Sequence, residues 1–399
     1  MRRAPVIPKG VWALGFVSMF MDISSEMIHS LLPIFLVSSL GASTAMLGLL
    51  EGTAEAAALM IRAFSGALSD RLGRRKSLAL AGYGLGALTK PLFAIAGGIG
   101  LVFTARLLDR FGKGIRGAPR DALVADLTPP RARGAAYGLR QSLDTVGAFL
   151  GPLLAMLMML ATANHIRSVF WIAVAPGLLS VAILDFGVKE PTGSPAARSG
   201  RTLHLRDMTK LGRSYWMVVA FGWTFTLARF SEAFLLLRAE NVGMQLFSIP
   251  AILLVLNLVY SLTAYPAGKL SDHIGRSGLM AAGLGVLIAA DLVLAFAAGI
   301  WQVAAGAGLW GLHLGLTQGL LAAMVADTAP QHLRATAFGV FSLASGVSIL
   351  AASLIAGLLW DLYGAAMPFF AGAAFAAVTL LGFLALSGRF KMEPSHENK

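Results

Sequence analysis

The sequence predicts an all-α polytopic membrane protein with twelve transmembrane helices in two pseudo-symmetric six-helix halves. Two observations predict this class: apolar segments of about 20 residues recur along the chain, and a polar string between two of them occurs twice. Composition agrees, because the mean hydropathy is +0.73 and 57% of residues are hydrophobic. Since only helices satisfy their own backbone hydrogen bonds in lipid over such lengths, every span is expected to be helical.

Each of the twelve apolar segments is long enough to cross a hydrocarbon core of about 30 Å. The first follows Arg2-Arg3 but carries Asp22 and Glu26, so we expect a retained helix rather than a signal peptide. The expected spans are about 11–37, 45–68, 77–97, 100–124, 134–160, 166–186, 214–239, 246–270, 277–298, 301–326, 334–360 and 365–387.

The longest connection divides the chain into two repeated halves. We expect an N-terminal bundle over 1–186, a cytoplasmic linker over 187–213 and a C-terminal bundle with a short tail over 214–399. Ser25-Glu26 recurs as Ser231-Glu232, and Val124-Ala125-Asp126 recurs as Val325-Ala326-Asp327. Apolar residues within the linker predict a short amphipathic helix on the membrane surface: Leu203, Leu205, Met208 and Leu211.

The net charge of +12 has a topological origin. Most Lys and Arg fall in the tails or in alternate connections, whereas the other connections hold Arg167, with Arg238 at a helix edge. This positive-inside asymmetry places both termini in the cytoplasm and removes the charge as an argument for nucleic-acid binding. We expect the chain to lie in the lipid bilayer of the cytoplasmic (inner) membrane of a bacterium. We also expect it to be a monomer.

The repeated polar string runs from Gly66 to Lys76 and returns in weaker form from Gly268 to Arg276. Its order of Gly, three residues, Asp, a basic residue, any residue, Gly and further bases resembles the loop 2–3 motif of the major facilitator superfamily. With the twelve spans and the duplication, the resemblance covers essentially the whole chain.

This resemblance implies alternating access with a gate at the repeated string. Asp70 would lie against the end of helix 11, and Arg74 or Arg75 would reach an acid near the end of span 4. The alternative is that these bases only determine topology. The implied gating residues are Gly66, Asp70, Arg71, Gly73, Arg74, Arg75, Asp121, Asp126, Asp272 and Arg276.

A second resemblance concerns the direction of transport. The run from Gly147 to Pro152 in span 5 is similar to the antiporter motif of drug and solute exporters, although Ala155 and Met156 stand where a Gly pair is usual. Gly147 and Gly151 share a helix face that permits close packing, and Pro152 removes an amide donor and can bend the helix. Simple small-residue packing is the alternative interpretation.

Charged residues within the spans concentrate in the first half. On span 4, Arg106, Arg110, Lys113 and Arg120 follow steps of four, three and seven and so share one helix face. By resemblance, Arg110 begins a segment implicated in proton coupling, where Lys113 replaces a common Gln. If any of these bases lacks a partner, it favours a substrate with an anionic group.

Acidic residues on neighbouring spans can compensate the charges of these bases. Asp22, Glu26 and His29 share one face of span 1, and Glu51 and Glu55 share one face of span 2. One interpretation is a neutral salt-bridge network that holds the helices together. The other is that one or two acids carry protons, and the expected proton-coupling residues are Asp22, Glu26, Glu55, Arg110 and Asp109.

Other polar and aromatic residues on the inner spans are candidates for the substrate cavity, with interhelical packing as the alternative. In the second half, Arg229 and Glu232 are three apart and predict an ion pair, and Asp291 is expected to lie outside the cavity. The substrate-binding candidates are Phe20, His29, Lys113, Gln141, Trp223, Phe230, Asn257, Tyr260 and Gln318.

The sequence contains no pattern for a cofactor, a metal site or an enzyme. The chain has no cysteine, its histidines lack ligand spacing, and no nucleotide-binding loop occurs. We predict a proton-coupled transporter that works by rocking of its halves and exports a small solute or drug by antiport. The alternatives are a proton symporter that imports an anionic metabolite, and a non-transporting sensor or lipid flippase.

Overall fold

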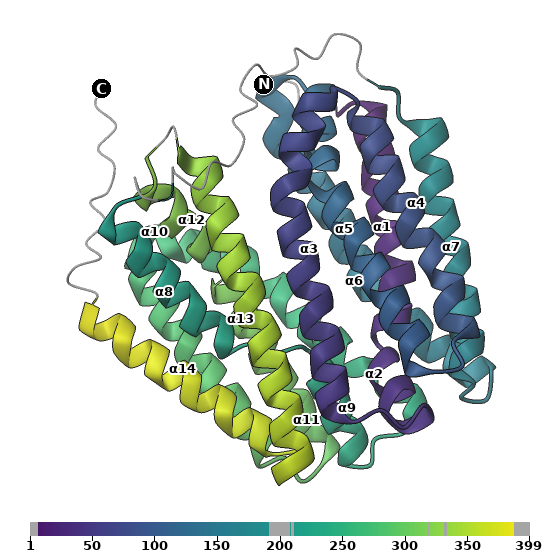
Figure 1. Cartoon of the computed structure of the whole chain (residues 1–399), viewed down its shortest axis with the longest axis vertical. Helices are drawn as coiled ribbons and strands as arrows, with labels where there is room; N and C mark the ends of the chain where they lie inside the picture. The colour runs from purple at the N-terminus through teal and green to yellow at the C-terminus, as the bar shows by residue number, and fades with distance from the viewer. Residues whose placement is uncertain (1–6, 191–207, 209–210, 318, 331–332, 387–399) are drawn as a thin grey trace.

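A computed structural model of the chain describes residues 7–190, 208, 211–317, 319–330 and 333–386, with side chains except at 67, 70–72, 269–276, 335 and 386. These described residues form helices and no strand, which confirms the all-α prediction (Figure 1). The expected amphipathic helix of the linker falls mostly outside the described residues.

The first half is a bundle of long helices joined by short connections. α1 packs against α6 and α7, while α5 packs against α3 and α4. The elements are α1 (Lys9–His29), α2 (Leu32–Ile34), a π-helical turn η1 (Phe35–Ser39), α3 (Thr44–Leu72), α4 (Arg75–Ile95), α5 (Ile99–Leu127), a 3-10 turn η2 (Pro130–Ala132), α6 (Arg133–Ala161) and α7 (Ile166–Gly187).

The second half repeats this arrangement with more interruptions. α10 packs against α11 and α14, and α13 packs against α8. The elements are α8 (Arg213–Leu227), α9 (Ala233–Asn241), a 3-10 turn η4 (Leu246–Ser248), α10 (Ala251–Ala295), α11 (Ile300–Thr317), α12 (Leu320–Thr328), α13 (Arg334–Tyr363) and α14 (Met367–Leu386).

The long helix α10 folds back on itself and supplies two expected spans. Its first arm runs parallel to α11, since Leu256 lies against Gly311 and Thr263 against Gly315. Its second arm runs antiparallel to α11, since Leu294 lies against Gly306 and Thr317 against Gly283. Helical backbone thus continues into the turn between spans 8 and 9, where the sequence predicts a break.

Ten segments of the described chain are long and apolar enough to cross a membrane. The two remaining expected spans correspond to α5, which carries many charges, and to α8 with α9. The sequence predicts a continuous helix over 214–239, and this is wrong: residues 228–232 separate α8 from α9. The break places Arg229 and Glu232 on non-helical backbone between the two halves, where such backbone borders a cavity rather than lipid.

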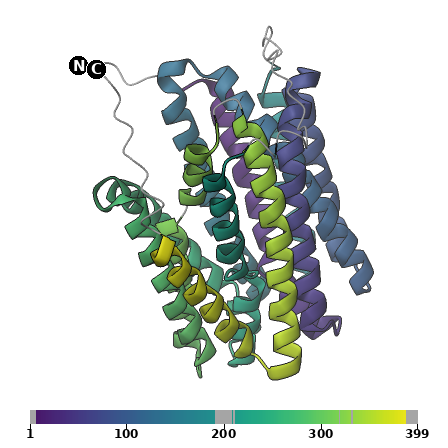
Figure 2. The ribbon, with the colours of Figure 1, turned by 60° about the vertical axis from the view of Figure 1, so that its left-hand side comes forward.

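Several of the described contacts between the halves lie at one end of the bundle. We call the end where α7 leads toward α8 the linker end, and the opposite end the far end. Gly48 and Gly52 of α3 lie against the backbone of α13 near Ser353 and Leu350, so glycine permits the close approach. Figures 1 and 2 show α3 and α13 side by side there, and Figure 1 shows them diverging toward the linker end.

Asp361 ties the end of α13 to the start of α3. Its carboxylate accepts hydrogen bonds from the Thr44 amide at 3.0 Å, the Thr44 hydroxyl at 2.6 Å and the Ala45 amide at 2.9 Å. A carboxylate is favoured at a helix N-terminus, where the amides have no helical partner. At the same end, the Ser38 hydroxyl donates to Glu240 at 2.5 Å. These contacts join the two halves at the far end.

Candidate functional site

A cavity of about 480 Å³ lies between the two halves and is lined by both. Charged residues dominate the wall of the first half, whereas the second half adds aromatic, hydroxyl and amide groups with one base and one acid. The lining residues are Glu26, His29, Glu51, Glu55, Leu59, Arg110, Lys113, Ala148, Thr226, Arg229, Phe230, Ser231, Glu232, Asn257, Trp310, Ser345 and Ile349.

A chain of ionisable side chains crosses the wall of the first half. On α1, His29 Nδ1 lies 3.4 Å from Glu26 Oε2, and its Nε2 lies 3.9 Å from Glu51 Oε2 of α3. Arg106 of α5 donates to that same Glu51 oxygen at 2.6 Å. Glu51 is fully buried, so its charge needs such partners. The chain connects the cavity to the interior of the first bundle.

The base-rich face of α5 is only partly neutralised. Arg110 lies 3.0 Å from Glu55, which compensates the charges of both. Lys113, nearly one turn further along, has no hydrogen-bond or ion-pair partner among the described residues and is exposed to the cavity. The condition for an anionic substrate group, a base on span 4 without a partner, is therefore met by Lys113.

The break between α8 and α9 brings a third base, Arg229, and a fourth acid, Glu232, to the cavity. The predicted ion pair of Arg229 with Glu232 is wrong, because no contact within 4.0 Å joins them in the described structure. The Arg229 guanidinium instead lies 5.5 Å from the centre of the Phe225 ring. Helical spacing underlies the prediction, and the helix ends at Leu227, before both residues.

Aromatic rings form the apolar part of the cavity wall. Phe230 packs against Trp310 at 5.7 Å between ring centres and against Phe369 at 5.4 Å. The Trp310 indole donates to Asp291 at 2.9 Å. Asp291 is fully buried and does not line the cavity, as expected, yet it holds a residue that does.

Helix α6 lines the cavity at Ala148 and packs against α1 through two of its glycines. A Cβ added to Gly147 would lie 3.0 Å from that of Asp22, and one added to Gly151 would lie 2.5 Å from that of Glu26. Pro152 has no amide hydrogen, so the carbonyl of Ala148 loses its helical donor. Asn257 of α10 donates to that carbonyl at 3.3 Å and joins the two halves beside the cavity.

Some charges predicted to work in coupling are held deeper in the first bundle. Lys90 donates to Asp109 at 2.8 Å and to Ser25 at 2.9 Å, and both charged residues are buried. Asp109 therefore belongs to the salt-bridge network that the alternative interpretation predicts. Asp22 does not line the cavity, and no hydrogen bond or ion pair joins it to another described residue.

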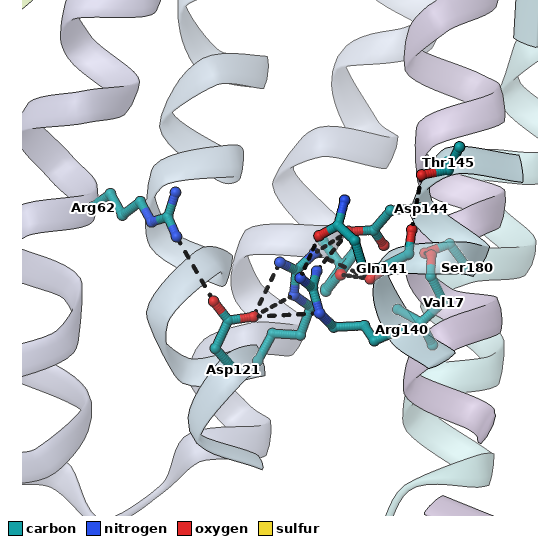
Figure 3. A network of polar contacts seen from close by, with 11 residues as sticks. Val17, Arg62, Asp121, Arg140, Gln141, Asp144, Thr145 and Ser180 are labelled. Atoms are coloured by element: carbon teal, nitrogen blue, oxygen red, sulfur yellow. Dashed lines mark hydrogen bonds and ion pairs between the residues drawn. The ribbon is translucent and has the colours of Figure 1, made fainter. Parts of the chain in front are cut away.

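Figure 3 shows a second polar network of the first half. Asp121 lies 3.1 Å from Arg120, 3.7 Å from Arg62 and 3.9 Å from Arg140. Arg140 also donates to Asp144 at 2.5 Å and to the amide oxygen of Gln141 at 3.0 Å. Gln141, a predicted substrate residue, thus lies in this network and not in the cavity lining.

The expected gating contact on the first polar string is present in part. Arg75 donates to Asp126 near the end of α5, one of the two acids expected for it. Gly73 ends α3 in the left-handed conformation with φ of 60°, which favours glycine. Gly66 packs toward Ala118, and Arg74 directly precedes α4. The side chains of Asp70, Arg71, Asp272 and Arg276 lie outside the described residues, and the role of this gate stays a prediction.

The remaining substrate-binding and proton-coupling candidates divide clearly. Glu26, His29, Glu55, Arg110, Lys113, Phe230 and Asn257 meet in the cavity, whereas Phe20, Trp223 and Tyr260 do not line it and Gln318 lies outside the described residues. Sequence reasoning left out Glu51, Trp310, Arg229 and Glu232 as site residues. The repeat of Ser25-Glu26 as Ser231-Glu232 is the signal that points to Glu232.

Comparisons with known proteins agree with this architecture. A family model described as Major Facilitator Superfamily matches residues 14–260 and 230–399. An uncharacterised MFS-type transporter of Methanocaldococcus jannaschii is 32% identical over 387 residues, which cover 92% of this chain and 94% of the relative.

A more distant relative and a solved structure are also similar to this chain. The quinolone resistance protein NorA of Staphylococcus aureus is 23% identical over 238 residues, which cover 59% of this chain and 60% of NorA. The crystal structure of the nucleoside transporter NupG matches with a TM-score of 0.77 at 14% identity, over 94% of this chain and 98% of NupG. The likeness to NupG concerns the fold alone.

Proposed function

The chain belongs to the major facilitator superfamily, and from this premise we propose that it is a proton-coupled antiporter that exports a small organic solute or drug. It works as a monomer in the cytoplasmic membrane of a bacterium, with both termini in the cytoplasm. Its two halves rock about the central cavity, and the far-end contacts close the outer side in the state described above.

The observation that carries this proposal is the set of unpartnered charges in a cavity lined by both halves. Lys113, Arg229 and Glu232 line it without an ion-pair partner among the described residues. A charge near the bilayer centre costs about 2.5–3.5 kcal/mol on insertion scales, so such residues are expected to serve a ligand or a proton. A purely structural role does not account for them, since structural charges such as Lys90 and Asp109 are paired.

Two further observations support export. The sequence of α6 resembles an antiporter motif, and its glycines pack directly against the part of α1 that carries Asp22 and Glu26. NorA, a distant relative, is named for resistance to a drug class. Glu26 lines the cavity and Asp22 does not, so Glu26 is the leading candidate for proton coupling.

A proteoliposome assay tests this function. Purified protein is reconstituted with a pH-sensitive dye inside, and a panel that begins with norfloxacin and includes anionic and cationic dyes is added to one side. Antiport predicts proton movement opposite to the solute. We expect Glu26→Gln to abolish this flux while Asp185→Asn, an exposed carboxylate at the linker end, leaves it unchanged. Equal flux in wild type and Glu26→Gln would remove Glu26 from the mechanism.

Symport of an anionic solute is the second candidate, and the two unpaired bases in the cavity favour it. Lys113 comes from the first half and Arg229 from the second, so a carboxylate or phosphate bound by both would draw the halves together. The sign of the flux decides: under an acidic exterior, symport accumulates the solute and antiport expels it. A sensor or a lipid flippase gives no solute-driven proton flux at all.

A further inference from the structure

We propose that the transported proton resides on His29, as an imidazolium that bridges Glu26 and Glu51. The inference rests on the proposed proton coupling and identifies where the proton is bound. It differs from the sequence-based expectation, in which a carboxyl group carries the proton and His29 contacts the substrate.

The geometry of the ring is the first argument. Nδ1 faces Glu26 at 3.4 Å and Nε2 faces Glu51 at 3.9 Å, so a carboxylate stands at each ring nitrogen. A neutral imidazole has a single N–H and can donate to only one of them. Imidazolium has two N–H groups, so it can donate to Glu26 and at the same time present a positively charged N–H toward Glu51. The bridge also links α1 to α3, because the two carboxylates come from different helices.

The balance of charge is the second argument. Arg106 donates to the same Glu51 oxygen at 2.6 Å, and the other oxygen of Glu51 is buried without a partner. With the proton on His29, the group of Glu26, His29, Glu51 and Arg106 holds two acids and two cations and is neutral. Without it, these four residues carry one net negative charge.

The other charged residues around the cavity are two acids, Glu55 and Glu232, and three bases, Arg110, Lys113 and Arg229. Glu55 of α3 faces His29 but is already compensated by Arg110 at 3.0 Å. Glu232, from the second half, also interacts with His29. The bases Arg110 and Lys113 of α5 interact with Glu26 from the cavity side, so they compete with His29 for its charge. Binding of the proton therefore changes the charge of the cavity wall at the place where both halves meet.

Nuclear magnetic resonance of ¹⁵N-histidine-labelled full-length protein in detergent tests the site without any solute. The His29 signal is identified by its absence from His29→Gln. We expect imidazolium shifts for His29 at neutral pH, and a move toward the neutral form in Glu51→Gln and in Glu26→Gln. A neutral His29 at neutral pH, or signals unchanged in both variants, would overturn the proposal.

Transport provides the second readout. With norfloxacin or the panel member that gives the largest flux, His29→Gln and His29→Lys should each lose at least ten-fold of the coupled proton flux, while size-exclusion chromatography shows that both remain folded. His165→Gln, the same change at an exposed histidine, is the control. Full coupling in His29→Gln would contradict the inference. If wild type moves no protons, the proposed function fails, while the NMR result still decides the protonation of His29.

Discussion

At the scale of single residues, the membrane-embedded charges fall into two groups with different physical roles. Lys90 with Asp109 and Arg106 with Glu51 are buried pairs whose partners come from different helices. Lys113 and Arg229 border the cavity without such partners. Because a paired buried charge is costly to separate, the first group stabilises the bundle, and the second is available to a ligand.

This division predicts the effect of breaking one buried pair. Lys90→Met leaves the Asp109 carboxylate buried without a cation, and we expect a loss of about 3–5 kcal/mol in the free energy of unfolding. Lys90→Met combined with Asp109→Leu should recover most of it. Thermal unfolding in detergent measures both.

An exposed pair serves as the control for that experiment. The side chain of Arg62 is 61% exposed and lies 3.7 Å from Asp121, so Arg62→Gln should change stability by less than about 1 kcal/mol. If Lys90→Met were no more destabilising than Arg62→Gln, the pair would have no structural role.

At the scale of elements, α6 shows how one helix serves both packing and the cavity. Gly147 and Gly151 let it lie against α1, and Pro152 leaves free a carbonyl that Asn257 of the other half can reach. The same residues therefore position Glu26 and connect the halves. Packing and function are not separate interpretations of the run from Gly147 to Pro152.

The contact of α6 with α1 can be tested by a matched pair of glycine substitutions. Gly151→Ala places a Cβ 2.5 Å from that of Glu26, and such overpacking should cost about 1–3 kcal/mol and shift Glu26. Gly138→Ala on the same helix meets nothing within 4 Å and should gain up to about 1 kcal/mol from helix propensity. Thermal unfolding and the proton-flux assay measure both; equal behaviour would exclude a tight contact at Gly151.

At the scale of the whole molecule, the two halves are joined by contacts at the far end. Asp361, the hydrogen bond from Ser38 to Glu240 and the glycine contacts of α3 with α13 all belong to this end. Alternating access requires that such contacts break when the opposite end closes. The far-end contacts are therefore expected to set the relative populations of the two states.

Spin labels can measure this balance directly, because the chain has no cysteine of its own. Labels at Ser39→Cys and Tyr363→Cys, both exposed and in opposite halves, report the far-end separation. Asp361→Ala removes three hydrogen bonds to a charged group, each worth about 1.5–3 kcal/mol, so the population with a wide far end should rise at least ten-fold. Asp185→Ala, whose contact stays within the first half, should leave the distances unchanged. If Asp361→Ala left the distribution of spin-label distances unchanged, Asp361 would have no part in stabilising the closed far end.

The candidate site was predictable only in part, and particular residues show why. Glu26, Lys113 and Arg110 could be identified because charge within an apolar span is visible in the sequence. Asp109 looked equivalent, and only the tertiary structure shows that it is paired with Lys90 on another helix. Arg229 and Glu232 were paired by helical spacing, which fails where the chain leaves the helix.

The sequence by itself determined the membrane class, the helical spans, the duplication and the presence of charges within the first half. These depend on hydropathy and spacing, which accumulate along the chain and require no knowledge of neighbours. The tertiary structure decided which of those charges are paired, where span 7 breaks, and that His29 lies between two carboxylates. Such relations depend on the rotation and depth of each helix against the others, and residues distant in sequence set them through packing.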